Sequence, residues 1–532
     1  MTNLLYNTDI STENSSIAIN ATMNRGSGLF SFKSYTLKQV CLFCLLILVS
    51  FIWGRRTFAS LWLDETLSWW VASSSLEQLF PRVQEYQGQS PVYFISLWFV
   101  QHSLGSSEWI LRIPSLLSGL LTLGLVYLIG RHLFDSQTAW TACLLYGISD
   151  GAIFSATSAR PYGMATLFAT ASFYSMMRYC KHKDACSIIL FFISSLLAIH
   201  THYLFIGILP IHWCYFATFC DAQRRKFAIS LGILQLVILA SLALHADQLS
   251  ILMQHSEFIS LRGSPSFSSV VAVILPIPFL LLMSIGYFVT QAMTRGHLQI
   301  DCSLKELSSR SNVFLLLWYL VPPLGLAMAS LFLHSSSLFS QRYLVWNTPA
   351  FAFLLARMIT VSKEQQSLKV FLLVTTLLFT LFDPFREITK EDWRHAISYA
   401  NTKIAEPISK ATVLFYPGLL ETRNLAWVSH SRAKEYLSAP LRYYNFHGQA
   451  HVLPFSIHIP GAIDTWDTRI KPLFESDSRV VLVGSNLVRL QGMSPMNYWK
   501  HILTRDGFGS FDIQKFKETF VLTAVKLPNV PS

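Results

Sequence analysis

The chain has 532 residues, of which 52% are hydrophobic and only 13% are charged, and its formal net charge is +11. Soluble proteins carry about 25% charged residues, so this composition excludes an ordinary soluble enzyme. The many apolar and aromatic residues also exclude a largely disordered chain. The basic residues stand in short clusters between apolar runs, which is typical of a membrane protein and not of a nucleic-acid-binding protein. We therefore expect a polytopic membrane protein that binds no nucleic acid.

Long apolar runs mark the membrane spans, because a helix needs about 20 mostly apolar residues to cross the bilayer. The first run, 36–53, ends at Arg55 and Arg56 and has no cleavage site after it, so we expect a retained span and not a signal peptide. Further runs follow at 110–130, 138–154, 161–178, 186–199, 203–220, 227–245, 268–292, 313–333, 345–361 and 368–383. The sequence thus predicts an all-α membrane module over 36–383 with about 11 transmembrane helices.

Loops rich in Lys and Arg alternate with loops that have few, which sets the orientation of the spans. The rich set holds Arg25 and Lys33, Arg131, Arg178 to Lys183, Arg224 to Lys226, Arg295 to Arg310, and Lys363 with Lys369. These loops are predicted to be cytoplasmic, so the leader 1–35 lies inside. With an odd number of spans, the carboxyl terminus lies outside.

Two regions are predicted on the outer side. The first is the loop 54–109, whose stretches 66–80 and 91–104 we expect to be helices at the membrane interface, anchored by tryptophans. The second is the tail 384–532, which reads as a soluble α/β domain. Neither region contains any of the chain's eight cysteines or an Asn-X-Ser/Thr acceptor, which favours a bacterial plasma (inner) membrane over the endoplasmic reticulum.

The tail begins with a predicted helix and continues with strands. Thr389 stands three residues before Asp392, a capping-box spacing, and an apolar stripe at helical period follows: Trp393, Ile397, Ala400 and Ile404. The apolar runs 411–416 and 480–483, closed by turns at Gly418 and Gly484, predict buried strands.

The first candidate site is the adjacent pair Asp64 and Glu65, directly after the first span. A carboxylate that is partly buried beside tryptophans at the membrane surface can act as a base near neutral pH. The alternative is that either acid caps the following helix, whose first turn favours negative charge. The two roles are compatible.

Further polar residues gather at the predicted outer ends of spans. Arg160 stands two residues before Tyr162, and Arg342 stands directly before Tyr343. Each arginine is either a lipid-phosphate anchor or a phosphate ligand in a site. Asp150 falls inside a predicted span, where a charge is costly and usually faces a cavity or a partner.

His200 and His202 stand two apart at the outer end of another span. On a helix this spacing splays the two side chains by roughly 200°, so interfacial hydrogen bonding is favoured over a shared metal.

At these positions the chain resembles the bacterial family 39-type glycosyltransferases of the GT-C superfold, which also includes the protein O-mannosyltransferases and the lipid A aminoarabinose transferases. The resemblance is carried by the acidic pair and, in order, by Gln89-Ser90-Pro91-Val92-Tyr93, Leu111-Arg112-Ile113-Pro114, Leu125-Val126-Tyr127, Ala159-Arg160-Pro161-Tyr162 and His200-Thr201-His202-Tyr203. Fainter echoes are Gln341-Arg342-Tyr343 and Glu391-Asp392-Trp393-Arg394.

The resemblance implies transfer of one sugar from a polyprenyl-phosphate donor to a lipid, glycan or protein hydroxyl on the outer face, with inversion. Asp64 is then the general base and Glu65 orients it or the sugar. Arg160 and Arg342 bind the donor phosphate, and the remaining substrate contacts come from Tyr162, His202, Tyr343, Gln89, Tyr93 and Asp150. The donor's lipid tail lies between the spans.

Two positions depart from the family pattern. Relatives commonly have a glutamate before the Ala-Arg pair where this chain has Ser158, and often a histidine or another charged residue where it has Gln89 and Ser90. Phosphate-linked lipid donors often need no metal in this superfold, so we expect no metal or other cofactor, with a divalent metal as the alternative.

Two other functions fit parts of the sequence. A transporter or flippase of lipid-linked sugars would use prolines such as Pro276 and Pro322 to break helices, but the spans 227–245, 268–292 and 313–333 contain no Asp, Glu, Lys or Arg. An inactive membrane scaffold whose tail binds partners fits the absence of a glutamate at Ser158.

Overall fold

The structure, a computed structural model, describes residues 47–219, 224–243, 265–274, 309–333, 339–361, 391–406 and 411–527. The predicted leader 1–35, the span 368–383 and Thr389 lie outside these residues. The chain divides into two compact units, 1–54 and 55–532. In the first unit the described residues 47–54 are helical, which agrees with the end of the first predicted span.

The second unit begins with the outer loop, which forms short helices: α2 (Leu63–Ala72), α3 (Leu76–Arg82), the turn η1 (Val83–Gln87), α4 (Val92–Leu104) and α5 (Glu108–Leu111). The expectation of one helix over 66–80 is wrong, because Ser73 ends α2 and Ser75, with an extended backbone, starts α3. The helix over 91–104 is confirmed as α4. Asp64 and Glu65 lie in the first turn of α2, as the capping alternative predicted.

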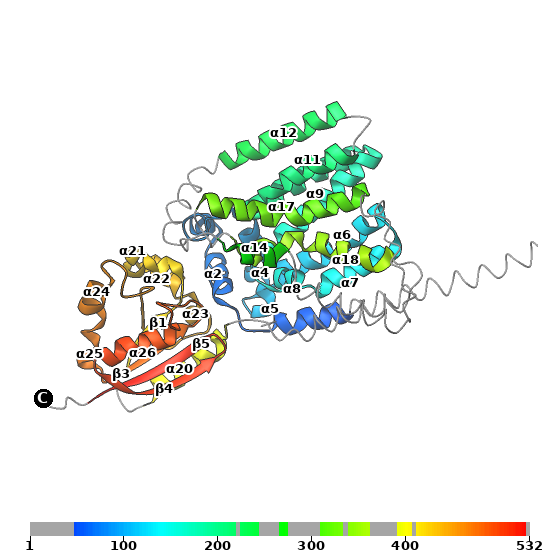
Figure 1. Cartoon of the computed structure of the whole chain (residues 1–532). Helices are drawn as coiled ribbons and strands as arrows, with labels where there is room; N and C mark the ends of the chain where they lie inside the picture. Colours follow the sequence, from blue (N-terminus) through cyan, green and yellow to red (C-terminus); the bar gives the residue numbers. More distant parts are fainter. Residues whose placement is uncertain are drawn as a thin grey trace, which may run out of the picture. The chain divides into compact units, whose positions relative to one another are not determined.

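The described membrane helices follow the predicted spans (Figure 1): α6 (Ile113–Leu133), α7 (Ser136–Ile148), α8 (Asp150–Thr157), α9 (Tyr162–His182), α10 (Ala185–Thr201), η2 (Tyr203–Gly207), α11 (Ile208–Phe219), α12 (Arg224–Ala243), α14 (Phe267–Ile274), α17 (Arg310–Phe332), η4 (Gln341–Tyr343), η5 (Val345–Asn347) and α18 (Thr348–Val361). Within the described residues, α6 and α17 are long and apolar enough to cross a membrane by themselves. The number of about 11 spans stays a prediction, because several runs lie partly outside the described residues.

The predicted single span over 138–154 is two helices. Ser149 has an extended backbone and its hydroxyl accepts a hydrogen bond from the Ala152 amide, so it caps a new helix. Asp150 is therefore the first residue of α8 and does not lie in mid-helix, which corrects its predicted setting. Its side chain is exposed, and a carboxylate in this first turn interacts favourably with the helix dipole.

The tail contains a five-stranded sheet in the order β2-β1-β3-β5-β4, made of β1 (Ala411–Tyr416), β2 (Ala450–Val452), β3 (Arg479–Ser485), β4 (Phe508–Phe516) and β5 (Thr519–Lys526). The first three strands are parallel, and β5 and β4 pair antiparallel at one edge. The strands predicted at 411–416 and 480–483 are confirmed. Gly418 follows β1 with a φ of +74°, but Gly484 lies inside β3 opposite Phe520, so it closes no turn.

Helices cover both faces of this sheet, and Figure 1 shows α20 (Trp393–Ala405) and α26 (Pro495–Arg505) alongside it. Asp392 caps α20 by accepting the His395 amide, and Trp393, Ile397 and Ala400 are buried as their spacing predicts. The other tail helices are η6 (Leu420–Arg423), α21 (Leu425–Ser429), α22 (Ser431–Leu437), α23 (Ala439–Tyr443), α24 (Ala462–Thr465), η7 (Trp466–Ile470) and α25 (Leu473–Ser476).

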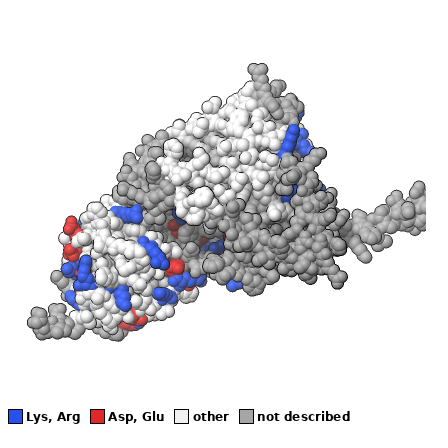
Figure 2. All heavy atoms as spheres, in the orientation of Figure 1, with Lys and Arg blue, Asp and Glu red and all other residues white. Residues whose placement is uncertain are grey.

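The face of the sheet that α20 covers shares one apolar core with the outer loop. This core joins Leu67 and Trp70 of α2 to Trp393, Phe415 and Tyr436 of the tail. The residues on the other face of the sheet, with α26, form a separate core. In Figure 2 the tail carries both basic and acidic groups, whereas the described surface of the membrane helices in that view is nearly free of them. An uncharged surface of this kind suits contact with lipid.

Candidate active site

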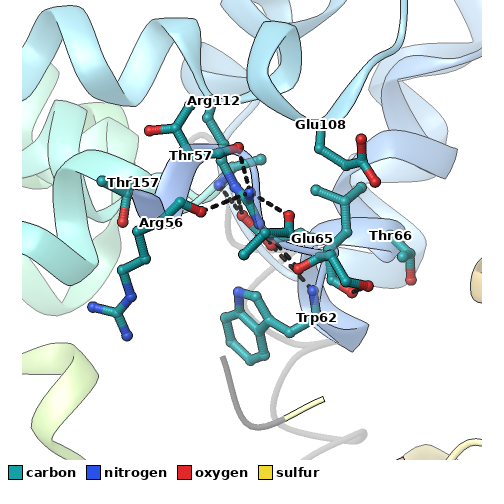
Figure 3. A network of polar contacts seen from close by, with 12 residues as sticks. Arg56, Thr57, Trp62, Glu65, Thr66, Glu108, Arg112 and Thr157 are labelled. Atoms are coloured by element: carbon teal, nitrogen blue, oxygen red, sulfur yellow. Dashed lines mark hydrogen bonds and ion pairs between the residues drawn. The ribbon is translucent and has the colours of Figure 1, made fainter. Parts of the chain in front are cut away.

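Glu65 and Arg112 form a fully buried ion pair beneath the start of α2 (Figure 3). Arg112 donates from Nε to Glu65 Oε1 at 2.8 Å and from Nη2 to Oε2 at 2.6 Å, a bidentate geometry. Its remaining N–H groups donate to backbone carbonyls of the chain that leads into α2, including those of Thr57 and Ala59 at 2.7 Å. This pairing satisfies two charges that would be costly to bury alone.

Glu65 also accepts two backbone amides. Its Oε1 accepts from Ala159 at 2.7 Å, and its Oε2 accepts from the amide of Trp62, the residue that precedes α2, at 3.1 Å. Both oxygens are therefore occupied inside the protein, and the residue ties α2 to the loop that carries Arg160. This arrangement favours a positioning role for Glu65, and its contact with the sugar stays a prediction.

Asp64 has a different partner, Arg342 of η4. Arg342 Nη1 donates to Asp64 Oδ2 at 3.0 Å. The buried Arg160 Nη1 donates to the Asp64 carbonyl at 3.3 Å, to Ser68 Oγ at 3.1 Å and to Gln87 Oε1 at 3.0 Å. The predicted base and both predicted phosphate ligands thus lie at one place, although 278 residues separate Asp64 from Arg342.

Three rings stand beside the two guanidinium groups. The His202 ring lies 5.4 Å from that of Tyr162 and 5.5 Å from that of Tyr343. Arg342 sits 5.0 Å from the Tyr343 ring, and Arg160 sits 6.0 Å from the Tyr162 ring, within or at the limit of cation–π contact. Burial and then the charges of Arg160 and Arg342 lower the pKa of His202 to about 3, so its imidazole is neutral.

Several nitrogen atoms of this cluster are buried without a hydrogen-bond partner among the described residues: Arg160 Nε, Arg342 Nε and both ring nitrogens of His202. Such atoms are rare in native proteins because each one left unsatisfied costs about 1–3 kcal/mol. Cationic donors of this kind can be satisfied by an oxyanion such as a phosphate.

The other predicted substrate residues are less central. Tyr93 in α4 is fully buried, and Gln89 lies in the turn just before that helix and is partly buried. Asp150 is at the far end of α8 from Ser158. Ser158 itself is buried, and its carbonyl accepts the Arg160 amide at 2.7 Å. Among the described residues no group of three or more His, Cys, Asp or Glu side chains could hold a metal ion.

Sequence reasoning missed how far the tail takes part in this region. Glu391 Oε2 accepts the amide of Leu63, the first residue of α2, at 2.7 Å, and its Oε1 accepts the Ser485 hydroxyl at 2.7 Å. The Tyr444 hydroxyl accepts the Leu61 amide at 2.8 Å. The tail therefore fixes the start of the helix that carries Asp64. The only sequence signal for this was the faint echo that begins at Glu391.

Glu391 predicts a pH-dependent stability. Burial and the charge of Asp64 raise its pKa from 4.5 to about 7, although hydrogen bonds from Leu63 and Ser485 oppose the shift. The folded state therefore holds this proton more tightly than the unfolded chain, and stability falls as the pH rises from about 4.5 to about 7. The shift corresponds to a contribution of roughly 3 kcal/mol to the free energy of unfolding, and this contribution is fully lost above that pH range.

Glu391→Gln should flatten the decline of the unfolding midpoint in detergent between about pH 5 and pH 8. Glu435→Gln, at an exposed glutamate of the tail, serves as the control and should keep the wild-type decline. An identical pH profile for wild type and Glu391→Gln would show that Glu391 is not protonated in the folded state.

Comparison with known proteins gives a partial family match and a fold. A family model described as dolichyl-phosphate-mannose-protein mannosyltransferase matches residues 88–249, and no curated protein matches the chain. ArnT from Cupriavidus metallidurans bound to undecaprenyl phosphate superposes with a TM-score of 0.52 at 14% identity, over 91% of this chain and 97% of that chain. The apo state of the same protein gives a TM-score of 0.52 at 13% identity over the same shares.

An oligosaccharyltransferase of Archaeoglobus fulgidus gives a TM-score of 0.46 at 13% identity over 90% of this chain and 72% of that chain, a likeness too weak to establish a shared fold. The match to ArnT covers nearly the full length of both proteins and establishes the fold that the resemblance implied. The chain, a helical membrane module with a small sheet domain at its carboxyl end, therefore shares the fold of ArnT, and its residues 88–249 match the mannosyltransferase family model.

Proposed function

We propose that this protein transfers a single sugar from a polyprenyl-phosphate donor to an acceptor hydroxyl on the outer face of a bacterial plasma membrane. The observation that carries the proposal is the meeting of Asp64 with Arg342 and Arg160, whose Nε atoms have no partner among the described residues. One carboxylate beside two guanidinium groups with open donor positions suits a reaction in which a hydroxyl attacks and a phosphate leaves.

In this reaction Asp64 takes the proton of the acceptor hydroxyl as its oxygen attacks the anomeric carbon of the sugar. The bond between that carbon and the phosphate oxygen breaks, and the electron pair leaves with the polyprenyl phosphate. Arg160 and Arg342 stabilise the negative charge on the departing phosphate, which needs a cation at that point. Attack opposite the leaving group inverts the anomeric centre.

The rings of Tyr162, His202 and Tyr343 form the side of the site that belongs to the membrane helices. Because the imidazole of His202 is neutral, it can hydrogen-bond a phosphate or sugar oxygen without adding charge. The two guanidinium groups supply the positive charge that a divalent metal would otherwise provide, so no metal is part of the proposal.

Lipid analysis tests the function directly. In cells that lack the protein, mass spectrometry of the lipid extract should show accumulation of one polyprenyl-phosphate sugar and loss of one glycosylated product. Re-expression of the wild-type chain should reverse both changes. If uptake or flipping of lipid-linked sugars changes while no product is lost, the transporter alternative replaces this proposal.

The phosphate role predicts weaker binding of undecaprenyl phosphate in the single variants Arg160→Gln and Arg342→Gln. A hydrogen bond to a charged group contributes about 1.5–3 kcal/mol, so each dissociation constant should rise roughly 10- to 100-fold. Arg489→Gln, at an exposed arginine of the tail, is the matched control and should bind like the wild type. Equal affinity of all four proteins, measured by scintillation proximity in detergent, would rule out this phosphate site.

A further inference from the structure

The tail reaches the phosphate-binding arginines through one chain of hydrogen bonds. Tyr436 of α22 accepts from Gln87 Nε2 at 3.1 Å, and Gln87 Oε1 accepts from Arg160 Nη1 at 3.0 Å. The Tyr436 hydroxyl also donates to the Tyr86 carbonyl at 3.2 Å. A single side chain, that of Gln87, therefore connects Tyr436 of the tail to Arg160.

The segment that follows β1 lies against the same part of the outer loop. Leu419 belongs to the core that the tail shares with α2, and the Trp427 ring packs 5.2 Å from that of Tyr86, next to Gln87. Between these two anchors, η6 carries Glu421, a partly buried glutamate. The two anchors hold η6 close to the site.

Glu421 lies near enough to the candidate active site for its charges to act on the Glu421 carboxyl group. The charged side chains that act on its carboxyl group are Asp64, Arg342 and Arg160, and Tyr436 is the tyrosine beside it. In the described part of the chain no ion pair joins Glu421 to a cation, so neither Arg160 nor Arg342 occupies its carboxyl group. A carboxyl group near two guanidinium groups but unpaired with them is available to a ligand.

We propose that Glu421, supplied by the tail domain, is a substrate-contacting residue that hydrogen-bonds the acceptor and orients its hydroxyl toward Asp64. The inference rests on the proposed transferase function. The two guanidinium groups attract the donor phosphate to the membrane side, beside the rings, so the acceptor is left with the side where the tail carries Glu421. The tail domain thus forms the acceptor side of the site.

Protonation fits this division of roles. Burial and then the charge of Asp64 raise the pKa of Glu421 to about 7, although Arg342 and Arg160 lower it. Near neutral pH a large share of Glu421 is therefore neutral and can both donate and accept a hydrogen bond. Asp64 is then the group that takes the proton.

The test compares Glu421→Ala with Glu421→Gln in membrane vesicles from cells lacking the protein, which contain donor and acceptor. Glu421→Ala should slow transfer about tenfold, because it removes a hydrogen bond to the substrate. Glu421→Gln, an uncharged group of the same shape, should recover most of the rate at pH 7 and should lose the change in rate that the wild type shows as Glu421 titrates. Binding of undecaprenyl phosphate should be unchanged or tighter in both variants.

Glu435→Gln is the matched control, since Glu435 is an exposed glutamate of the same domain. Transfer by Glu421→Ala at the wild-type rate would overturn the inference, as would a matching loss of undecaprenyl phosphate binding. If Glu421→Ala does not fold, a Glu421→Gln protein that keeps the wild-type pH profile overturns it equally. Absence of transfer by the wild type itself would count against the proposed function and not against Glu421 alone.

Discussion

Asp64→Asn should lower sugar transfer at least about 100-fold while the protein stays folded, because general-base catalysis contributes about 10²- to 10⁴-fold. Asparagine has the shape of aspartate and still accepts a hydrogen bond from Arg342, but it cannot take a proton. The Asp64–Arg342 pair is partly exposed, with the arginine side chain 37% accessible, so its loss should cost about 1 kcal/mol of stability or less. We therefore expect this variant to lose its transfer activity and to keep its fold.

The measurement is the initial rate of product formation in vesicles, with the unfolding midpoint recorded in parallel. Asp464→Asn, at an exposed aspartate of α24, is the control and should transfer at the wild-type rate. Undecaprenyl phosphate should bind to Asp64→Asn at least as tightly as to the wild type, because the substitution removes a negative charge near the phosphate. Wild-type transfer by Asp64→Asn would mean that another group acts as the base.

Glu65→Gln should destabilise the protein strongly. It leaves the guanidinium of Arg112 buried without its carboxylate, and breaking a buried ion pair in this way typically costs 3–5 kcal/mol. This is a large part of the total stability of a typical protein. We expect low yields from membranes and a markedly lower unfolding midpoint in detergent.

A double variant and a second ion pair sharpen this test. Glu65→Leu combined with Arg112→Met removes both charges, so it should be more stable than Glu65→Gln. Glu108→Gln breaks the more exposed pair between Glu108 and Arg394, and it should cost only about 1 kcal/mol. A Glu65→Gln protein as stable as the wild type would show that the buried pair contributes little to the fold.

Local patterns predicted most of the described membrane helices, and three residues chosen from the sequence, Asp64, Arg160 and Arg342, lie together in the structure. A segment that crosses lipid must be apolar over most of its length, so α6, α9 and α10 follow their predicted spans closely. Ser149 was the exception. A single serine does not interrupt an apolar run, and its capping hydrogen bond to Ala152 becomes visible only in three dimensions.

The contacts of the tail could not be predicted in this way. The hydrogen bonds that the Leu63 amide donates to Glu391 and the Leu61 amide donates to Tyr444 join residues more than 300 positions apart, and no periodicity encodes such a pairing. The ion pair of Glu65 was not foreseen for the same reason, since its partners Arg112 and Ala159 come from separate segments. Adjacent acids suggested a shared function, but Glu65 pairs with Arg112 and Asp64 pairs with Arg342.

The most direct test is a structure of the purified protein with undecaprenyl phosphate. We predict that the phosphate lies on the outer side of the membrane between Arg160 and Arg342, with its oxygens about 2.7–2.9 Å from guanidinium nitrogens and beside Asp64. A phosphate that binds elsewhere and contacts neither the two arginines nor Asp64 would contradict the account.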